Sequence, residues 1–436
     1  MARLCVSLTC PVVLATALAA ARPARGQEPS PAPSPPADNP APARDELPEG
    51  GGWISKRVRA ALSEHEPGRE GFHLGPLYPA VSIPSTGSGL APTLHLWAPA
   101  IRGSRLDVHA SAAYSWQRSQ YYDLQVGAIP HRAQHKPNLT TGTDSVYPMS
   151  DLYKTAGLRR FDLYLNLHHR VYPREEFYGL GPATTVADRS DYTLHDTLVE
   201  LVSEYRVASW LTISVQGGVL KTSLGHGNNG GVVDTLARFD DGGAPGLVGQ
   251  PDYIHASVGV LLDSRDQPDN PHRGGALGLA VTRFDESPGT EFQFNRLTVD
   301  GRRFVAFGAR QRHVLAVHGL GSFDQPDAGG RVPFYLQSAL GGAHVLRGFQ
   351  PFRFRDEDLL ALSGEYRFEL VPKVELAAFY DAGKVFRSIG DLDLHHLATS
   401  WGAGLRLKTP TKVRLRVDVA HSREGTRLIV KFAPAF

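Results

Sequence analysis

The residues of this chain whose types and spacing could do chemistry are one arginine in a glycine-rich segment and two acids downstream of it. Arg347 stands directly before Gly348 and Phe349. Glu365 and Asp381 follow in segments that read as strands. A buried arginine is tolerated only where carboxylates meet it, because an unpaired interior charge costs several kcal/mol. One loop arginine and two inward-facing acids would therefore fasten a loop inside a barrel.

Signatures of catalysis are missing from the sequence. No G-x-S-x-G elbow occurs, and the segment from Ser85 to Gly89 has the wrong spacing. There is no H-E-x-x-H, no Walker loop and no glycine-rich dinucleotide turn after a strand. A membrane-embedded phospholipase is the enzyme alternative, and although serine and histidine are plentiful, no spacing points to a triad. We therefore expect neither an enzyme nor a cofactor.

Metal binding is not predicted either, although the chain has 18 histidines. The pairs at 168–169 and 395–396 are adjacent, and neighbours on a strand point to opposite faces, so neither pair can chelate one metal. One further group has enough oxygen ligands for calcium by count but reads better as a hydrogen-bonded turn: Asp263, Asp266, Asp269 and Asn270.

The N-terminus predicts export. Residues 1–27 read as a secretory signal peptide, because Arg3 supplies the positive start and a mainly apolar run with small residues follows. The only two cysteines, Cys5 and Cys10, fall inside this signal. The mature chain is therefore expected to lack disulfides and thiolate metal sites.

Two short segments follow the signal. Residues 28–52 are rich in proline and alanine and predict an extended linker. Residues 53–70 predict a short pre-barrel helix with an apolar stripe opposite basic side chains, which would lie on the membrane or in a barrel lumen. Lys and Arg number 46 against 44 Asp and Glu, so the overall charge gives no indication of nucleic acid as a partner.

From 71 to 436 an alternation of period two replaces helical periodicity. In 412–421, Val413, Leu415, Val417 and Val419 alternate with charged residues. After residue 21 no stretch approaches the ~20 apolar residues of a membrane helix. A barrel strand, however, shows lipid only every second side chain, and about ten residues cross a bilayer when tilted. We predict an all-β, transmembrane antiparallel β-barrel.

The alternation predicts sixteen strands. They are 72–83, 90–99, 104–116, 119–129, 157–170, 191–206, 209–220, 252–263, 274–284, 291–307, 311–322, 357–370, 373–385, 399–408, 412–421 and 425–436. The end of such a barrel normally lies in the periplasm, which places the short connections there and the long segments 221–251 and 323–356 outside. The same parity makes 130–155 a long periplasmic connection, which is unusual, so one of the first four strands is expected to be misplaced.

Strand phasing turns the two acids toward the barrel interior. Apolar side chains at alternate positions of 362–370 face lipid, which turns Glu365 and Arg367 inward. The same alternation over 376–382 turns Asp381 inward. In a partly dry lumen a bidentate arginine–carboxylate contact is one of the stronger polar pairings. The alternative is that both acids are ordinary solvated lumen residues.

Residues 71–436, and most sharply 252–436, resemble the C-terminal barrel of the BamA/TamA-type outer-membrane assembly proteins, the bacterial surface antigen family. The matching motifs follow in the family's order: Phe177-Tyr178-Gly179-Leu180-Gly181-Pro182, Asp263-Ser264-Arg265-Asp266 with Asn270-Pro271-His272-Arg273-Gly274, Gly341-Gly342 with Leu346-Arg347-Gly348-Phe349, Gly364-Glu365-Tyr366-Arg367-Phe368, and Phe379-Tyr380-Asp381-Ala382-Gly383. The resemblance implies that the 323–356 loop folds into the lumen and that Arg347 contacts Asp381 and Glu365 there.

The C-terminus also fits the resemblance. Phe432 and Phe436 match the aromatic signal that barrel-assembly machinery reads on the last strand. Pro434 cannot donate to a strand ladder and would weaken pairing with the first strand, where the family has its proposed lateral gate. The simpler interpretation is a frayed chain end.

The resemblance implies a bacterial outer-membrane location and a role in inserting or translocating proteins or lipid-linked clients. Family members with this role carry periplasmic POTRA domains, whereas here mostly linker separates the signal from Gly71, so no such domain fits. The alternative is a passive channel or structural barrel that has lost the translocase role. Expected partners are outer-membrane lipid, the assembly machinery, and a client polypeptide or a separate periplasmic protein.

Overall fold

The computed structural model describes residues 76–82, 84–85, 87–99, 106–129, 160–408 and 413–431. The predicted signal peptide, linker and pre-barrel segment, and the terminal Phe432 and Phe436, lie outside these residues. Within them, no helix is both long enough and apolar enough to cross a membrane.

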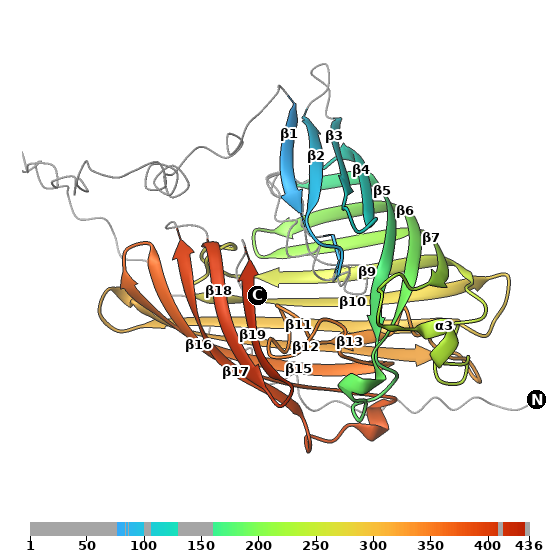
Figure 1. Ribbon diagram of the computed structural model, residues 1–436. Coiled ribbons are helices and arrows are strands. Elements are labelled where there is room, and N and C mark those ends of the chain that lie inside the picture. The colour runs from blue at the N-terminus through green and yellow to red at the C-terminus, as the bar shows by residue number, and fades with distance from the viewer. Residues whose placement is uncertain are drawn as a thin grey trace, which may run out of the picture. The chain divides into compact units, whose positions relative to one another are not determined.

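Strands make up nearly all of the described secondary structure (Figure 1). The long ones are β1 (Leu77–Ser82), β2 (Ala91–Ala98), β3 (Asp107–Tyr114), β4 (Gln120–Ala128), β5 (Phe161–Phe177), β6 (Ser190–Ala208), β7 (Leu211–His226), β9 (Asp252–Asp263), β10 (Gly274–Ser287), β11 (Phe294–Phe307), β12 (His313–Pro326), β15 (Asp358–Val371), β16 (Val374–Phe386), β17 (Ala398–Lys408), β18 (Val413–Ser422) and β19 (Gly425–Lys431). The connections hold β8 (Val233–Asp234), α3 (Thr235–Arg238), β13 (Ser338–Leu340), β14 (Phe354–Asp356) and the 3₁₀ turns η4 (Val186–Asp188), η5 (Ala309–Gln311) and η6 (Ile389–Asp391).

Each long strand pairs antiparallel with the next one along the chain, from β1 to β19. The two-residue β8 joins the edge of β6 in parallel, which completes a sheet of 17 strands. β13 and β14 pair with each other in a separate two-stranded sheet. Among the residues that the structure describes, no ladder joins β19 to β1. The predicted all-β antiparallel sheet is thus confirmed.

Every one of the sixteen predicted strands overlaps an observed strand, including the first four. The expectation that one of the early strands was misplaced is wrong, because β1 to β4 pair in sequence order and β4 pairs with β5. The doubt rested on the length of the connection after β4. Lengthening a loop adds little closure entropy, so length alone does not argue against the strands beside it.

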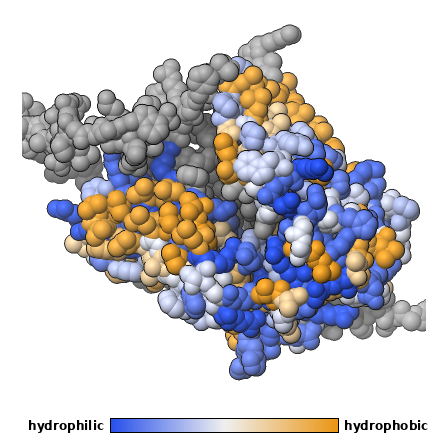
Figure 2. Space-filling view, in the orientation of Figure 1, coloured by the Kyte–Doolittle hydropathy of each residue, from blue (hydrophilic) through white to orange (hydrophobic). Residues whose placement is uncertain are grey.

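Side chains alternate between the two faces of the sheet as the pattern predicts. In β15, Leu362 and Tyr366 are 49% and 39% exposed, whereas Glu365 between them is fully buried. The outer faces of β16 and β17 carry Tyr380 and Trp401, which are also exposed. In Figure 2 a hydrophobic area, coloured orange, covers the place where Figure 1 shows β16 and β18.

One position breaks the predicted alternation. Val413 was expected on the lipid-facing side with Leu415, but it is 2% exposed. The cause is a bulge between β17 and β18: Leu407 pairs with Leu415 and Lys408 pairs with Val413, so Arg414 is skipped. An extra residue in one strand reverses the facing of the residue beyond it.

The connections differ in length at the two ends of the sheet. One end, here called the turn end, carries the short connections 209–210, 308–312 and 372–373. The opposite loop end carries 227–251 and 327–357. These connections agree with the predicted separation, but the turn end also carries the longer connections 129–160 and 264–273, and the loop end carries the short turn 423–424.

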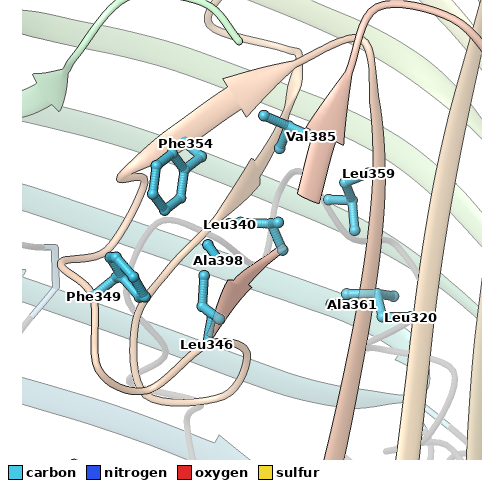
Figure 3. Close-up of a cluster of buried hydrophobic side chains, with 9 residues drawn as sticks. All are labelled: Leu320, Leu340, Leu346, Phe349, Phe354, Leu359, Ala361, Val385 and Ala398. Carbon is cyan, nitrogen blue, oxygen red and sulfur yellow. The ribbon is translucent and has the colours of Figure 1, made fainter. Parts of the chain in front are cut away.

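The longest connection of the described loop end, 327–357, packs against the inner face of the sheet. Its residues Leu340, Leu346, Phe349 and Phe354 form one apolar cluster with side chains of β12, β15, β16 and β17 (Figure 3). A second cluster joins Phe334 and Tyr335 of the same connection to Phe177 in β5 and Tyr192 in β6. Burial of these side chains from water holds the connection against the wall.

Candidate functional site

Arg347 lies in the 327–357 connection, and its guanidinium reaches two neighbouring strands. Nε and Nη2 donate to the two carboxylate oxygens of Asp381 in β16, at 2.9 and 2.8 Å. Nη1 donates to Glu365 in β15 at 2.6 Å. The backbone N–H of Arg347 adds a bond to Asp381 at 3.0 Å. The structure therefore brings together the three residues that the sequence singled out.

Neutral groups complete the surroundings of Arg347. Ser363 accepts a hydrogen bond from Nη2 at 3.1 Å and donates its own to Asp381 at 2.6 Å. The Arg347 guanidinium carbon lies 3.4 Å from the centre of the Phe379 ring, a cation–π contact. Ser363, Glu365, Phe379 and Asp381 all occupy inward positions, because alternate residues of a strand share a face.

Further charged side chains join this group, which we call the arginine cluster. Arg406 in β17 donates to Glu365 at 3.0 Å and to Asp418 in β18. The cluster consists of Arg347, Arg367, Arg406, Arg416, Glu365, Asp381 and Asp418.

Positive charge is in excess in the arginine cluster, with four arginines against three carboxylates. Arg416 is fully buried, lies 3.5 Å from Asp418, and donates to the carbonyl of Ala343 in the 327–357 connection at 2.9 Å. Removing one partner from a buried ionic group costs about 3–5 kcal/mol, because the remaining charge is left uncompensated. The connection and the wall thus depend on each other for charge balance.

The glycines and the phenylalanine of the motif serve close packing. A Cβ on Gly348 would lie 2.6 Å from Cβ of Ser400 and 2.8 Å from Cβ of Ser422, so no larger residue fits. A Cβ on Gly383 would lie 3.0 Å from a backbone oxygen of β15. Phe349 is fully buried and meets Phe354 edge to face, with ring centroids 5.2 Å apart.

The electrostatics of Arg347 favour its charged form. Burial acts to lower the pKa of Arg347, but the hydrogen bonds and charge of Asp381 and the charge of Glu365 hold it above its ordinary value. Arginine has no acceptor and keeps its proton at any physiological pH. The side chain therefore acts as a permanent cation and not as an acid or base.

A second buried arginine of the same connection was not anticipated from the sequence. Nε of Arg353 donates to both carboxylate oxygens of Glu424, in the turn between β18 and β19, at 2.8 and 3.0 Å. Its two Nη atoms donate to the hydroxyl and the carbonyl of Thr184, in the β5–β6 connection, at 2.9 and 2.7 Å. The guanidinium carbon also lies 4.8 Å from the Tyr178 ring centre.

The site residues that sequence reasoning missed differ in whether the sequence carries a signal for them. Arg406, Arg416 and Asp418 stand on the charged side of strands whose alternation is clear, so phasing alone turns them inward. Thr184 and Glu424 stand in loops far apart in the sequence, where no periodicity applies.

The residues considered for metal binding have other roles. His168 lies 3.7 Å from Asp196 on the inner face, while His169 meets Thr197 on the outer face at 2.8 Å. Asp266 accepts backbone N–H bonds from Gln267, His272 and Arg273, as a structural turn requires. No group of three His, Cys, Asp or Glu side chains within the described part of the chain could hold a metal ion.

Comparisons with known proteins agree with this geometry. Residues 243–428 match the model of the Omp85 superfamily domain. The structure is similar to that of BamA from Haemophilus ducreyi lacking POTRA domains 1–3, with a TM-score of 0.54, 14% identity, and coverage of 81% of this chain and 67% of that one.

Two further solved structures align with the chain. CdiB from Escherichia coli gives a TM-score of 0.46 with 14% identity over 83% of this chain and 60% of CdiB. CdiB from Acinetobacter baumannii gives 0.45 with 11% identity over 83% of this chain and 57% of CdiB. No curated protein matches the chain.

The arginine cluster lies within the range that the family model matches. The matched range runs from the end of the 227–251 connection to β19 and contains Arg347, Glu365 and Asp381. Residues 243–428 thus match the Omp85 superfamily domain, and the described part of the chain has an all-β fold similar to that of the BamA barrel.

Proposed function

We propose that this barrel assists the insertion or translocation of a polypeptide, or of a lipid-linked client, at the bacterial outer membrane. The observation that carries the proposal is the 327–357 connection, which Arg347 fastens to the inner faces of β15 and β16 through Asp381 and Glu365. A passive pore needs an open lumen. A connection held by a buried ionic cluster serves instead to keep the lumen occupied and the wall around it in a defined state.

The terminal strands support the same proposal. β1 and β19 are the first and last strands of the sheet, and no ladder joins them in the part of the chain that the structure describes. A strand edge with unpaired N–H and C=O groups is a template for another strand. A client strand added there would gain backbone hydrogen bonds without breaking the rest of the sheet.

The role needs partners that we also propose. A separate periplasmic protein would deliver the client, and assembly machinery would recognise the last strand through Phe432 and Phe436. An exported N-terminus, from the signal peptide at 1–27, would bring the chain to the outer membrane.

The direct test is client folding in liposomes. The purified barrel would be reconstituted, an unfolded outer-membrane barrel protein added, and its folding rate compared with that in protein-free liposomes. We expect faster folding with the reconstituted protein, and less acceleration with Arg347→Ala, because that variant releases the connection. Equal rates with and without the protein would refute the proposed function.

Conductance in planar bilayers separates an occupied lumen from a passive channel. We expect small, irregular openings in the natural protein and larger ones in Arg347→Ala. Arg331→Ala is the matched control, because Arg331 lies in the same connection but is 31% exposed at its side chain and pairs with Asp241 and Glu291. A large, steady, ion-selective pore in the natural protein would favour the channel.

A further inference from the structure

Arg303 in β11 points out of the sheet toward the surrounding membrane. Its neighbour Arg302 faces inward, where it pairs with Asp300 at 3.0 Å. Consecutive strand residues point to opposite faces, and Arg303 is accordingly exposed. Across the ladder it pairs with Gly275 in β10 and Val317 in β12.

The surroundings of Arg303 are apolar. Val317 beside it is 47% exposed, and Val305 and Phe307, further toward the turn end of β11, are 46% and 47% exposed. These are the side chains that meet lipid in an outer-membrane barrel. An ionisable side chain among them is costly and marks a functional site with a partner.

No partner for Arg303 exists within the described residues, since neither a hydrogen bond nor an ion pair joins it to them. Other outward cations of the wall are paired. Arg283 in β10 bonds Asp285 and Asp327, both at 2.7 Å, and Lys221 in β7 lies 2.8 Å from Asp252. Both of these lie near the loop end, whereas Arg303 lies four residues before the turn end of β11.

The stem of Arg303 lies over a glycine of the neighbouring strand β10. A Cβ on Gly275 would lie 3.4 Å from Cδ of Arg303, so the arginine stem crosses a position without a side chain. Next along the turn end, His313 bonds the Tyr366 hydroxyl at 2.7 Å and stacks on Phe307 with ring centroids 5.3 Å apart. Aromatic side chains of this kind gather at the level of lipid headgroups.

The turn end also carries exposed charges of both signs. Arg273, Arg310 and Lys373 stand exposed in three connections of the turn end. Acids are present there too: Glu369 pairs with Lys408 and Asp263 with Arg265, Asp266 accepts backbone N–H bonds, and Asp269 is exposed. The guanidinium of Arg303 itself, which lacks a partner among the described residues, therefore favours a ligand with negative charge over a neutral one.

We propose that Arg303 binds the headgroup phosphate of an anionic phospholipid in the leaflet at the turn end of the barrel. The planar guanidinium matches two phosphate oxygens at once, and the acyl chains would lie on Val305, Val317 and Phe307. The aromatic group around His313 and Tyr366 fixes the depth of the headgroup. The proposal rests on the barrel lying in a membrane and is independent of what the barrel moves.

The test counts lipids retained by the full-length protein. Protein purified from nanodiscs of equal parts phosphatidylglycerol and phosphatidylcholine would be examined by native mass spectrometry after progressive delipidation. We expect one phosphatidylglycerol molecule to be retained in excess, and Arg303→Gln to lower that retention about fivefold, as expected for one cation near a membrane surface. Arg303→Lys should show intermediate phosphatidylglycerol retention, because lysine keeps the positive charge but lacks the planar guanidinium that bonds two phosphate oxygens at once.

Arg283→Gln is the matched control, because Arg283 also faces outward but already has carboxylate partners. This variant should retain as much phosphatidylglycerol as the natural protein does. Heat-modifiability on gels would show that each variant is folded. Equal phosphatidylglycerol retention by Arg303→Gln and the natural protein would overturn the proposal. Displacement of the lipid by millimolar inorganic phosphate would overturn the assignment to a lipid, since it would mean that the site binds phosphate alone.

Discussion

Arg347 and Arg353 belong to the same connection and are both 1% exposed, but their partners come from different parts of the sheet. Arg347 bonds carboxylates of β15 and β16, the two strands that directly follow its connection. Arg353 bonds Glu424 beside β19 and Thr184 beyond β5, which are distant from each other in the sequence. The first anchor attaches the connection to the neighbouring wall. The second joins two distant loops through the connection.

This difference predicts different energetics. Arg347 lies in a group of seven charged side chains that are all buried, so removing the charge of any one of them leaves a buried charge without compensation. Arg353 shares one carboxylate that is 15% exposed and two neutral acceptors. If the Glu424 carboxylate is lost, Arg353 still has the two Thr184 oxygens as acceptors, and solvent reaches the partly exposed position of Glu424.

The largest expected effect comes from Asp381→Asn. Asp381 accepts three bonds from Arg347, so the variant removes one of three carboxylates that balance four buried arginines and should lower the free energy of unfolding by about 3–5 kcal/mol. Urea unfolding in detergent micelles would measure the change. Asp285→Asn, at the 51% exposed partner of Arg283, is the control and should cost less than about 1 kcal/mol. Similar losses of stability in both variants would contradict the view that the arginine cluster stabilises the fold more than an exposed ion pair does.

Glu424→Gln should have a smaller effect. The amide keeps an acceptor for Arg353 but loses the charge, which should lower the free energy of unfolding by about 1–2 kcal/mol. The same urea series would measure it. A loss as large as that of Asp381→Asn would show that the two anchors are equivalent, contrary to the comparison.

The segments whose amide hydrogen exchange increases should also differ between variants of Arg353 and of Arg347. Because Arg353 joins separate loops, Arg353→Ala should increase amide hydrogen exchange in 178–189 and 423–424 while leaving β15 unchanged. Arg347→Ala should instead increase exchange within 340–350. Hydrogen exchange with mass spectrometry would resolve the two patterns, and an identical pattern for both variants would contradict the assignment of the two anchors.

The smallest expected effect is a pH dependence that neither anchor supplies, since arginines keep their charge. Glu357 ends the connection, and burial, with Asp324 and Asp356 nearby and Arg387 opposing them, raises its pKa from 4.5 to about 7. Between pH 4.5 and about pH 7, the Glu357 carboxyl is therefore mostly protonated in the folded chain and mostly ionised in the unfolded chain. This contribution to stability is complete below the ordinary pKa of Glu357 and is lost as the pH rises through 7.

Thermal unfolding between about pH 5 and about pH 8 would measure this effect. We expect the midpoint of unfolding to fall over that range, and Glu357→Gln to flatten the profile because the amide does not titrate. An unchanged profile in Glu357→Gln would assign the pH dependence to another group.

The strands and the inward facing of Glu365 and Asp381 could be predicted because both follow from one periodic signal. A strand with one face in lipid must alternate, and the register follows from that alternation. Val413 was predicted wrongly because a bulge is a local two-against-one pairing that depends on the partner strand.

The rest of the site depends on contacts between segments that are distant in the sequence. Arg416 and Asp418 could be placed on the inner face, but their meeting with Arg406 and Glu365 depends on the stagger of three ladders. Arg353, Thr184 and Glu424 stand in loops, where the backbone follows no period. Their contact exists only once the whole sheet has formed.

The arginine cluster has a consequence for how the barrel is built. Its carboxylates come from β15, β16 and β18 and its other guanidiniums from β15, β17 and β18. A slip of one residue in any of these ladders would turn the corresponding charge out into lipid and leave Arg347 without its full set of partners. The connection therefore makes all of its ionic contacts only where four strands are paired in the native register. The full set of contacts around Arg347 is thus compatible with only one register of these four strands.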